Sequence, residues 1–179
     1  MFSVGDAVVY RHHVCRIASI RKNYYQGNDY LELHVLFENS LKLFVSVVEA
    51  EPPALRPVME RDKALALIDS IVDIEDIDAA ALIKNADTPA LVDRRIKEEY
   101  DKRLKSYAPE ELLPIMKLAY ERSQERRENG RNATATDKRY FSLAEGLLCD
   151  ELAVSLGVDR EKIGDYLVER IEKATGTAL

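Results

Sequence analysis

The sequence predicts an α+β protein in which a small antiparallel β-barrel is followed by a compact all-helical domain. Two observations predict this class. Up to about residue 58, apolar and polar side chains alternate with a period near two, and β-branched and aromatic residues are frequent. Beyond that point, apolar residues recur at the spacing of an α-helix. The length of 179 residues accommodates two small domains, so we expect a barrel domain over residues 1–58 and a helical domain over residues 59–179.

Four short strands are expected in the first domain. The turn-forming residues Gln26–Asp29 lie between two aromatic-rich stretches and indicate a hairpin. In the strand that follows, Leu31 and Leu33 share one face, and Glu32 and His34 share the other. Short strands at this spacing are typical of a small barrel. The expected strands are Ala7–Tyr10, Arg16–Tyr24, Tyr30–Phe37 and Leu41–Val47.

Helix start and stop residues divide the second domain. Thr88 followed by Pro89 predicts a helix start, with threonine as the N-cap and proline as the first helical residue. Asn129 and Gly130 predict a helix end. The expected helices are Arg61–Ile71, Thr88 to about Lys105, Pro109 to about Asn129, Thr136–Gly157 with Thr136 as its cap, and a last one capped by Asp159, with an acidic linker at Asp73–Asp78.

Composition excludes several classes of protein. No apolar run approaches the roughly 18 residues of a membrane-spanning helix, and the N-terminus lacks the features of a signal peptide. Two cysteines, Cys15 and Cys149, are too few for a disulfide framework, which predicts a reducing, cytoplasmic location. The net charge of −6 argues against a protein that coats nucleic acid by bulk charge.

Sequence motifs for catalysis and cofactor binding are absent. The chain has no phosphate-binding glycine loop, no nucleophile elbow and no zinc-protease or CxxC pattern. His13 and Cys15 could share one face of a strand, but metal sites usually need three or four ligands. We therefore expect a non-enzymatic protein with no catalytic residues, metal, cofactor or small-molecule substrate. An enzyme of unknown type is the least favoured hypothesis.

Basic residues gather in the middle of the chain. Residues 91–140 carry 13 basic and 10 acidic side chains, a balance of +3, whereas both flanking segments are net acidic. Phosphate contacts would be expected here. The alternative is a solvated face, because interleaved glutamates favour pairing within each helix. The candidate DNA-binding residues are Arg94, Arg95, Lys97, Arg122, Arg126, Arg127, Lys138 and Arg139.

Several segments, in order along nearly the whole chain, resemble one family. They are F-x-V-G-D-x-V-V-Y at Phe2–Tyr10, V-C-R-I at Val14–Ile17, N-S-L-K-L-F-V-S-V at Asn39–Val47, L-R-P-V at Leu55–Val58, and the stretch Asp137–Ala153. This set resembles the CarD/CdnL regulators, which share their first domain with the polymerase-interacting module of the transcription-repair coupling factor. No single motif is specific, but the colinear set is.

The resemblance implies a Tudor-like β domain that docks on the β subunit of bacterial RNA polymerase. It also implies a helical domain that touches promoter DNA beside the −10 element, so that the open complex is stabilised. We expect docking through an exposed strand edge by β-augmentation. The expected polymerase-binding residues are Lys42, Leu43, Phe44, Val45 and Ser46.

The chain departs from the family at two informative positions. Ser46 stands where the family usually has proline. Several family members insert a tryptophan into the minor groove, a wedge that props open a kinked step, but this chain contains no tryptophan. Alignment through Arg94 places Leu91 and Val92 near that position, as weaker aliphatic wedge candidates. Together with the net acidity, the missing tryptophan favours a second hypothesis: a protein–protein interaction module that binds polymerase, or another partner, without touching DNA.

Overall fold

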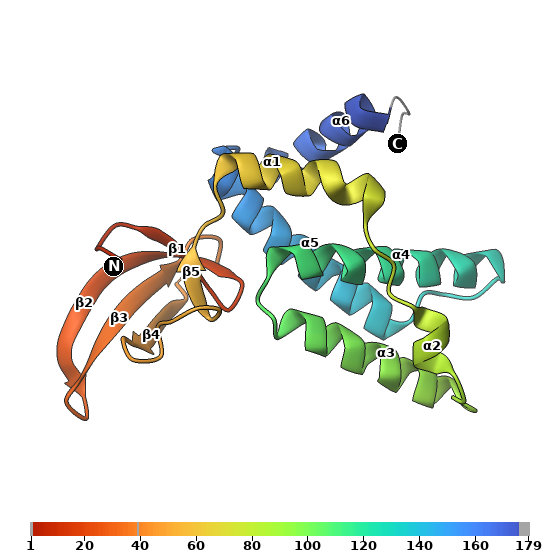
Figure 1. Cartoon of the computed structure of the whole chain (residues 1–179), viewed down its shortest axis with the longest axis horizontal. Coiled ribbons are helices and arrows are strands. Elements are labelled where there is room, and N and C mark those ends of the chain that lie inside the picture. Colours follow the sequence, from red (N-terminus) through yellow and green to blue (C-terminus); the bar gives the residue numbers. More distant parts are fainter. Residues whose placement is uncertain (1, 39, 176–179) are drawn as a thin grey trace. The chain divides into compact units, whose positions relative to one another are not determined.

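Five antiparallel strands form one sheet in the computed structural model, which describes residues 2–38 and 40–175. The strands are β1 (Ala7–Tyr10), β2 (His13–Tyr25), β3 (Asn28–Val35), β4 (Lys42–Ser46) and β5 (Leu55–Pro57), and their order across the sheet is β4-β3-β2-β1-β5 (Figure 1). The four expected strands are confirmed. The sheet is open, however, so the expected Tudor-like barrel is not confirmed. Closure would require the two outer strands to pair, and β5, with three residues, pairs only with β1.

Two tight turns explain why β2 and β3 begin earlier than expected. Arg11 and His12 both have positive φ, 48° and 80°, and connect the paired residues Tyr10 and His13. A two-residue turn with this backbone matches the twist of the flanking strands, so β2 starts at His13. A second two-residue turn brings Tyr25 opposite Asn28.

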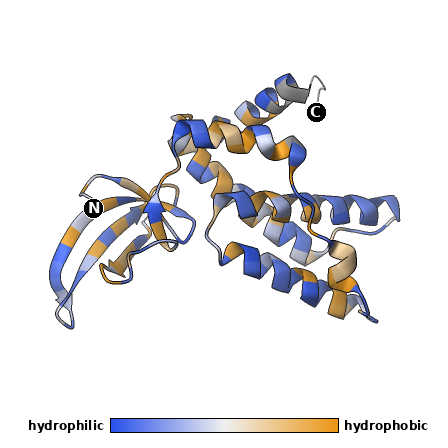
Figure 2. Cartoon of the chain, viewed as in Figure 1, coloured by the Kyte–Doolittle hydropathy of each residue, from blue (hydrophilic) through white to orange (hydrophobic). Residues whose placement is uncertain are grey.

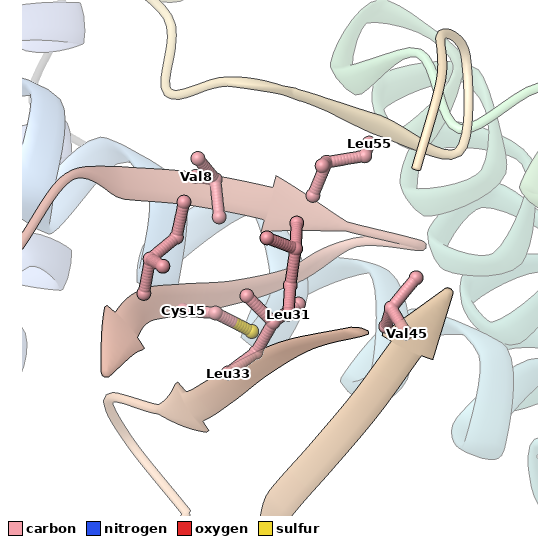
Figure 3. Packing of buried hydrophobic residues seen from close by; sticks show 7 residues of the cluster. Val8, Cys15, Leu31, Leu33, Val45 and Leu55 are labelled. Carbon is pink, nitrogen blue, oxygen red and sulfur yellow. The ribbon is translucent and has the colours of Figure 1, made fainter. Parts of the chain in front are cut away.

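The apolar face of the sheet forms a core of its own. Seven buried side chains meet there, and six of them are labelled in Figure 3: Val8, Cys15, Leu31, Leu33, Val45 and Leu55, with Ile17 as the seventh. The alternation that predicted this face is visible as bands of hydropathy along the strands (Figure 2). Full burial of each large aliphatic side chain contributes about 1.5–3 kcal/mol.

The regular structure that follows β5 in the described chain is helical. The helices are α1 (Arg61–Asp69), α2 (Ala79–Ile83), α3 (Pro89–Leu104), α4 (Leu112–Glu128), α5 (Ala135–Leu156) and α6 (Ile163–Thr175), with 3₁₀ turns at Ser70–Asp73, Pro109–Glu111 and Arg160–Lys162. Within the described residues, no helix is both long and apolar enough to cross a membrane.

Side-chain caps confirm some of the expected helix ends and correct others. Thr88 Oγ1 accepts a hydrogen bond from the Leu91 N–H at 3.2 Å, as expected. The expected cap Thr136 is wrong, because Thr134 caps α5: its Oγ1 accepts from the Asp137 N–H at 3.0 Å and donates to the Asp137 carboxylate at 2.8 Å. This reciprocal pairing at a three-residue spacing resembles a capping box.

Asp159 and the acidic linker also differ from expectation. Asp159 precedes a 3₁₀ turn and makes no side-chain capping bond; its carboxylate pairs with Lys162 instead. The segment expected as a linker leads into α2, a short helix that the sequence did not indicate. Asp78, the last residue of that segment, caps α2 by accepting from the Ala81 N–H.

The chain divides into two compact units, each built from two stretches of sequence. One comprises Met1–Leu65 with Cys149–Gly164, and the other comprises Ala66–Leu148 with Asp165–Leu179. The expected boundary near residue 58 lies inside the first unit. That unit therefore contains the sheet together with the last turns of α5.

A buried ion pair joins these two stretches within the first unit. Both Glu151 oxygens accept hydrogen bonds from Arg56, at 2.5 and 2.7 Å, and one also accepts from the Met59 N–H at 3.0 Å. Glu151 is 3% exposed. Arg61 adds a bond of 2.8 Å to the carbonyl of Leu156. The strand β5 is thus fastened to the end of α5.

Replacing Glu151 by alanine is expected to lower the free energy of unfolding by about 3–5 kcal/mol, because the largely buried Arg56 guanidinium then loses both of its hydrogen bonds to this carboxylate. Urea denaturation of the full chain measures the change. The control is Glu161→Ala, which removes an exposed carboxylate from the same unit and is expected to shift stability by less than about 0.5 kcal/mol. Equal stability of the two variants would contradict the role given to this ion pair.

Candidate docking edge and basic surface

Strand β4 lies at an edge of the sheet and pairs only with β3. The pairing fixes which of its backbone groups face outward. Val35 N–H donates to the carbonyl of Leu41 at 3.0 Å, and Val47 N–H donates to the carbonyl of Asp29 at 2.9 Å. Bonded and non-bonded pairs alternate along an antiparallel ladder. The odd-numbered residues of β4 therefore bond to β3, and the backbone groups of Lys42, Phe44 and Ser46 point to the free edge.

Most of these outward groups have no partner within the described chain. The Ser46 carbonyl accepts from the Glu49 N–H at 3.0 Å, which closes the turn after the strand. The N–H and C=O of Lys42, the N–H and C=O of Phe44, and the N–H of Ser46 remain for another strand to pair with. The predicted segment Lys42–Ser46 is thus an available strand edge.

An aromatic and cationic cluster lies beside this edge, on the sheet face opposite the core. We call it the edge cluster: Arg21, Tyr24 and Phe44. The rings of Tyr24 and Phe44 stack with centroids 5.2 Å apart and planes 13° apart. The Arg21 guanidinium lies 5.2 Å from the Phe44 ring centroid and 5.3 Å from that of Tyr24. Tyr24 and Phe44 are 48% and 41% exposed, so both rings are accessible to a partner.

A buried carboxylate holds the edge cluster in place. Glu32 accepts hydrogen bonds from Arg21 at 2.7 and 3.0 Å and from the Ser19 hydroxyl at 2.8 Å, and His34 Nε2 lies 3.1 Å from its other oxygen. The hydrogen bonds from Arg21, Ser19 and His34 lower the pKa of Glu32 to about 2. Glu32 lies on the face opposite Leu31 and Leu33, as the alternation predicted, yet it is only 7% exposed. The guanidinium of Arg21 is consequently fixed beneath the two rings.

The basic candidates of α3 are all engaged within the second unit. Arg94 pairs with Glu98 and Lys97 with Asp101, each four residues further along the helix. Arg95 instead donates to the carbonyls of Leu82 and Lys84, at 3.1 and 2.6 Å. Arg94 and Lys97 remain exposed, so a phosphate could compete for them, whereas Arg95 anchors the end of α2.

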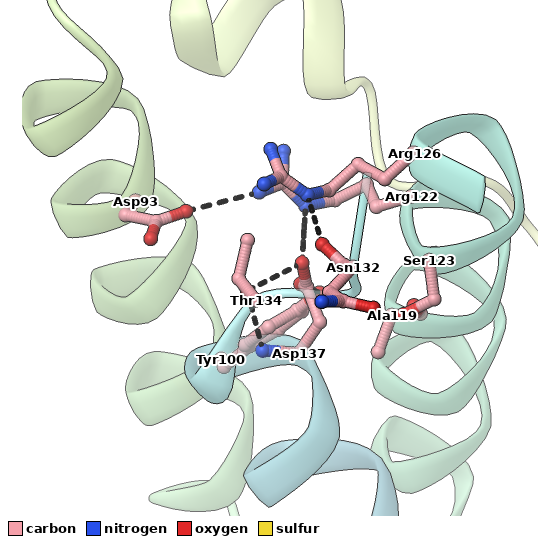
Figure 4. A network of polar contacts seen from close by, with 9 residues as sticks. All are labelled: Asp93, Tyr100, Ala119, Arg122, Ser123, Arg126, Asn132, Thr134 and Asp137. Carbon is pink, nitrogen blue, oxygen red and sulfur yellow. Dashed lines mark hydrogen bonds and ion pairs between the residues drawn. The ribbon is translucent and has the colours of Figure 1, made fainter. Parts of the chain in front are cut away.

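Arg122 serves a buried polar network, so its guanidinium is committed to the fold. Figure 4 shows it between Asp93 and Asp137, to which it donates at 3.2 and 3.1 Å. Asp137 is fully buried and also accepts from the Tyr100 hydroxyl at 3.0 Å. Burial, together with the negative charge of Asp137, raises the pKa of Tyr100 above its usual range.

The remaining basic candidates lie at the end of α4 and the start of α5. Arg126 uses its Nε to donate to the carbonyl of Asn132 at 2.7 Å (Figure 4). Arg127 donates to the Gln124 side chain, and the Arg139 guanidinium lies 5.8 Å from the ring centroid of Tyr140. Lys138 is exposed.

A pocket of about 840 Å³ opens between the start of α3 and the end of α4. Val92, one of the two wedge candidates, lines it, and both Leu91 and Val92 are half-buried. Three arginines and three carboxylates also line the pocket, so their formal charges cancel: Arg122, Arg126, Arg131, Asp87, Asp93 and Glu125.

His13 and Cys15 are not arranged to share a ligand. His13 pairs with Glu38 at 3.4 Å, while Cys15 lies in the core of the sheet, where burial raises the pKa of its thiol to about 12. Among the described residues, no group of three or more histidine, cysteine, aspartate or glutamate side chains is placed to hold a metal ion.

Comparison with models of known protein families and with curated proteins finds no match for this chain.

The stabilising effect of Glu32 is expected to disappear in acid. Because its pKa is lowered from 4.5 to about 2 in the folded chain, its contribution is complete above pH 4.5 and is lost as the pH falls towards 2. Glu32→Gln is therefore expected to melt at a lower temperature than the wild type at pH 7, with a gap that shrinks between pH 4.5 and 2. Thermal unfolding followed by circular dichroism checks this, and a gap that is constant with pH would refute it.

Proposed function

We propose that this protein is a non-enzymatic, cytoplasmic transcription regulator that binds the β subunit of bacterial RNA polymerase. In this proposal, weak contacts from the helical residues to promoter DNA, without sequence specificity, stabilise the open complex. The free edge of β4 is the observation that carries the proposal. Its five unpaired backbone groups suit the addition of a strand from a partner.

The chemistry of the edge favours a protein partner. Main-chain hydrogen bonds would supply affinity, and the side chains beside them would supply specificity. The stacked rings of Phe44 and Tyr24 offer apolar area with the fixed Arg21 charge below, and aromatic residues and arginine are the residue types enriched in binding hot spots. The identity of the partner comes from the resemblance of Phe2–Tyr10 and the colinear segments to the CarD/CdnL family.

Weak DNA contact is sufficient in this mechanism. Docking on polymerase raises the effective concentration of the helical residues at the promoter. A factor that binds the melted complex more tightly than the closed complex shifts the equilibrium by that difference in affinity. Arg126, whose Nε alone is used for the bond to Asn132, and Arg131 line the pocket at the start of α3 and are suitable phosphate contacts. Such contacts position a protein without reading sequence.

A second candidate function is binding of polymerase, or of another protein, without DNA contact. The internal pairing of the basic residues favours it, since Arg95 and Arg122 are committed to the fold and Arg94 and Lys97 have carboxylate partners. The balanced charges of the pocket beside Val92 point in the same direction.

Replacing Phe44 by proline tests the docking edge. The Phe44 N–H faces outward, so proline removes a donor from the free edge without removing a bond to β3, and proline is tolerated on edge strands. Phe44→Ala, which keeps the N–H, separates the loss of the ring from the loss of the donor. We expect binding of the full chain to the isolated β lobe of polymerase to weaken by about tenfold for alanine and by about a hundredfold for proline. Wild-type affinity of a folded Phe44→Pro chain would exclude docking through β4.

A salt titration separates the two candidate functions. If phosphates are contacted, affinity for a polymerase–promoter complex should fall with rising salt, and Arg126→Ala combined with Arg131→Ala should make that dependence shallower. Binding of this variant to the β lobe alone serves as the control and should be unchanged. An identical salt dependence for the variant and the wild type would favour the second candidate function, protein binding without DNA contact.

A further inference from the structure

A second surface, separate from the β4 edge, lies between α4 and α5 in the helical unit. We call it the α4–α5 groove. It has a volume of about 300 Å³, small residues contribute much of its lining, and it is bordered by Tyr120 and Phe141. Tyr120 is 53% exposed. The residues that line the groove are Ala119, Tyr120, Ser123, Arg127, Ala133, Asp137, Lys138, Phe141 and Ser142.

The polar groups deepest in the groove are already satisfied. The Ser123 hydroxyl donates to the carbonyl of Ala119 at 2.7 Å, within its own helix. Asp137 is fully buried, and its carboxylate accepts from Tyr100, Arg122 and Thr134. The inner surface of the groove is therefore suited to an apolar side chain.

Two cations border this apolar surface. Arg127 donates from Nη1 to the Gln124 side chain at 3.1 Å, and Gln124 donates in turn to the Tyr120 hydroxyl at 2.7 Å. The Lys138 ammonium has no hydrogen-bond or ion-pair partner among the described residues. Among the described residues that line the groove, Asp137 is the only one with a carboxylate, and its charge is paired with Arg122. The exposed border thus carries two positive charges in a chain whose net charge is −6.

We propose that the α4–α5 groove binds an acidic segment of a partner protein. One large apolar or aromatic side chain of the segment occupies the groove, and carboxylates beside it pair with Arg127 and Lys138. Charge complementarity selects an acidic partner, and the small, apolar interior selects a side-chain anchor. A DNA backbone would pair with the two cations but would leave the apolar interior of the groove unfilled. An acidic peptide with an apolar side chain fits both parts of the surface. In this proposal Arg127 and Lys138 bind a partner protein and not DNA. The proposal does not depend on docking to polymerase.

Titration of the isotope-labelled full chain with synthetic peptides tests the proposal by nuclear magnetic resonance. The probe is a short acidic peptide with a central Phe-Leu pair between aspartates and glutamates. The comparison peptide has the same charges with Gly-Ser at the centre, and a single-stranded oligothymidylate represents nucleic acid. The probe is expected to shift the amide signals of residues 119–127 and 133–142 and to bind at least about tenfold more tightly than the comparison peptide.

Charge reversal at the border provides the matched variants. Arg127→Glu with Lys138→Glu is expected to weaken binding of the probe by at least about tenfold, as is truncation of the exposed ring by Tyr120→Ala. Lys102→Glu with Lys105→Glu makes the same change of charge at two exposed positions at the end of α3 and should leave the affinity within about twofold. The proposal fails if the groove signals do not move, if the Gly-Ser peptide binds equally well, or if oligothymidylate occupies the groove more tightly than the probe.

Discussion

The buried ion pair between Arg56 and Glu151 joins residues 95 positions apart in the sequence and fixes one side of the sheet. Because the carboxylate also accepts the Met59 N–H, β5 and the start of α1 are both fastened to the last turns of α5. A buried charge pair is costly to break by removal of one partner, so these elements are expected to remain together. The opposite side of the sheet has no such attachment within the described residues of the first unit, and β4 is left as its free edge.

Local order at this free edge follows from a second set of charges. An unpaired strand edge exposes a protein to unwanted pairing with other chains, and β4 presents such an edge over five residues. The exposed face of Phe44 is also held in a defined geometry, since Glu32 fixes Arg21 and Arg21 lies against both rings. A surface that is ordered before binding loses less conformational entropy when a partner arrives. This combination is the physical basis for the proposed docking site.

Local patterns in the sequence predicted the features that depend on neighbouring residues. The alternation predicted the strands and the shared face of Leu31 and Leu33, and the Thr88-Pro89 pair predicted the start of α3. Thr134 was missed as a cap because Thr136 is the same residue type two positions later. In the structure Thr134 is distinguished by its hydrogen bonds with both the backbone N–H and the carboxylate of Asp137.

Features that depend on distant residues could not be predicted. The open sheet depends on β5 pairing with β1 alone. The edge cluster depends on an irregular register between Arg21 and Tyr25, which period-two alternation does not describe. Arg122 resembled a surface cation in the sequence, but its partners lie 29 and 15 residues away. The order of strands across the sheet, by contrast, places the predicted segment Lys42–Ser46 at an edge.

Amide hydrogen exchange along β4, with and without the isolated β lobe of RNA polymerase, measures whether a partner strand adds at this edge. In the free chain, the amides of Leu43 and Val45 should exchange slowly, because they bond to β3, and those of Lys42, Phe44 and Ser46 should exchange rapidly. Addition of the β lobe should slow exchange at these three outward-facing amides and leave the alternate positions unchanged. Rapid exchange at all three amides in the presence of saturating β lobe would contradict docking by strand addition at this edge.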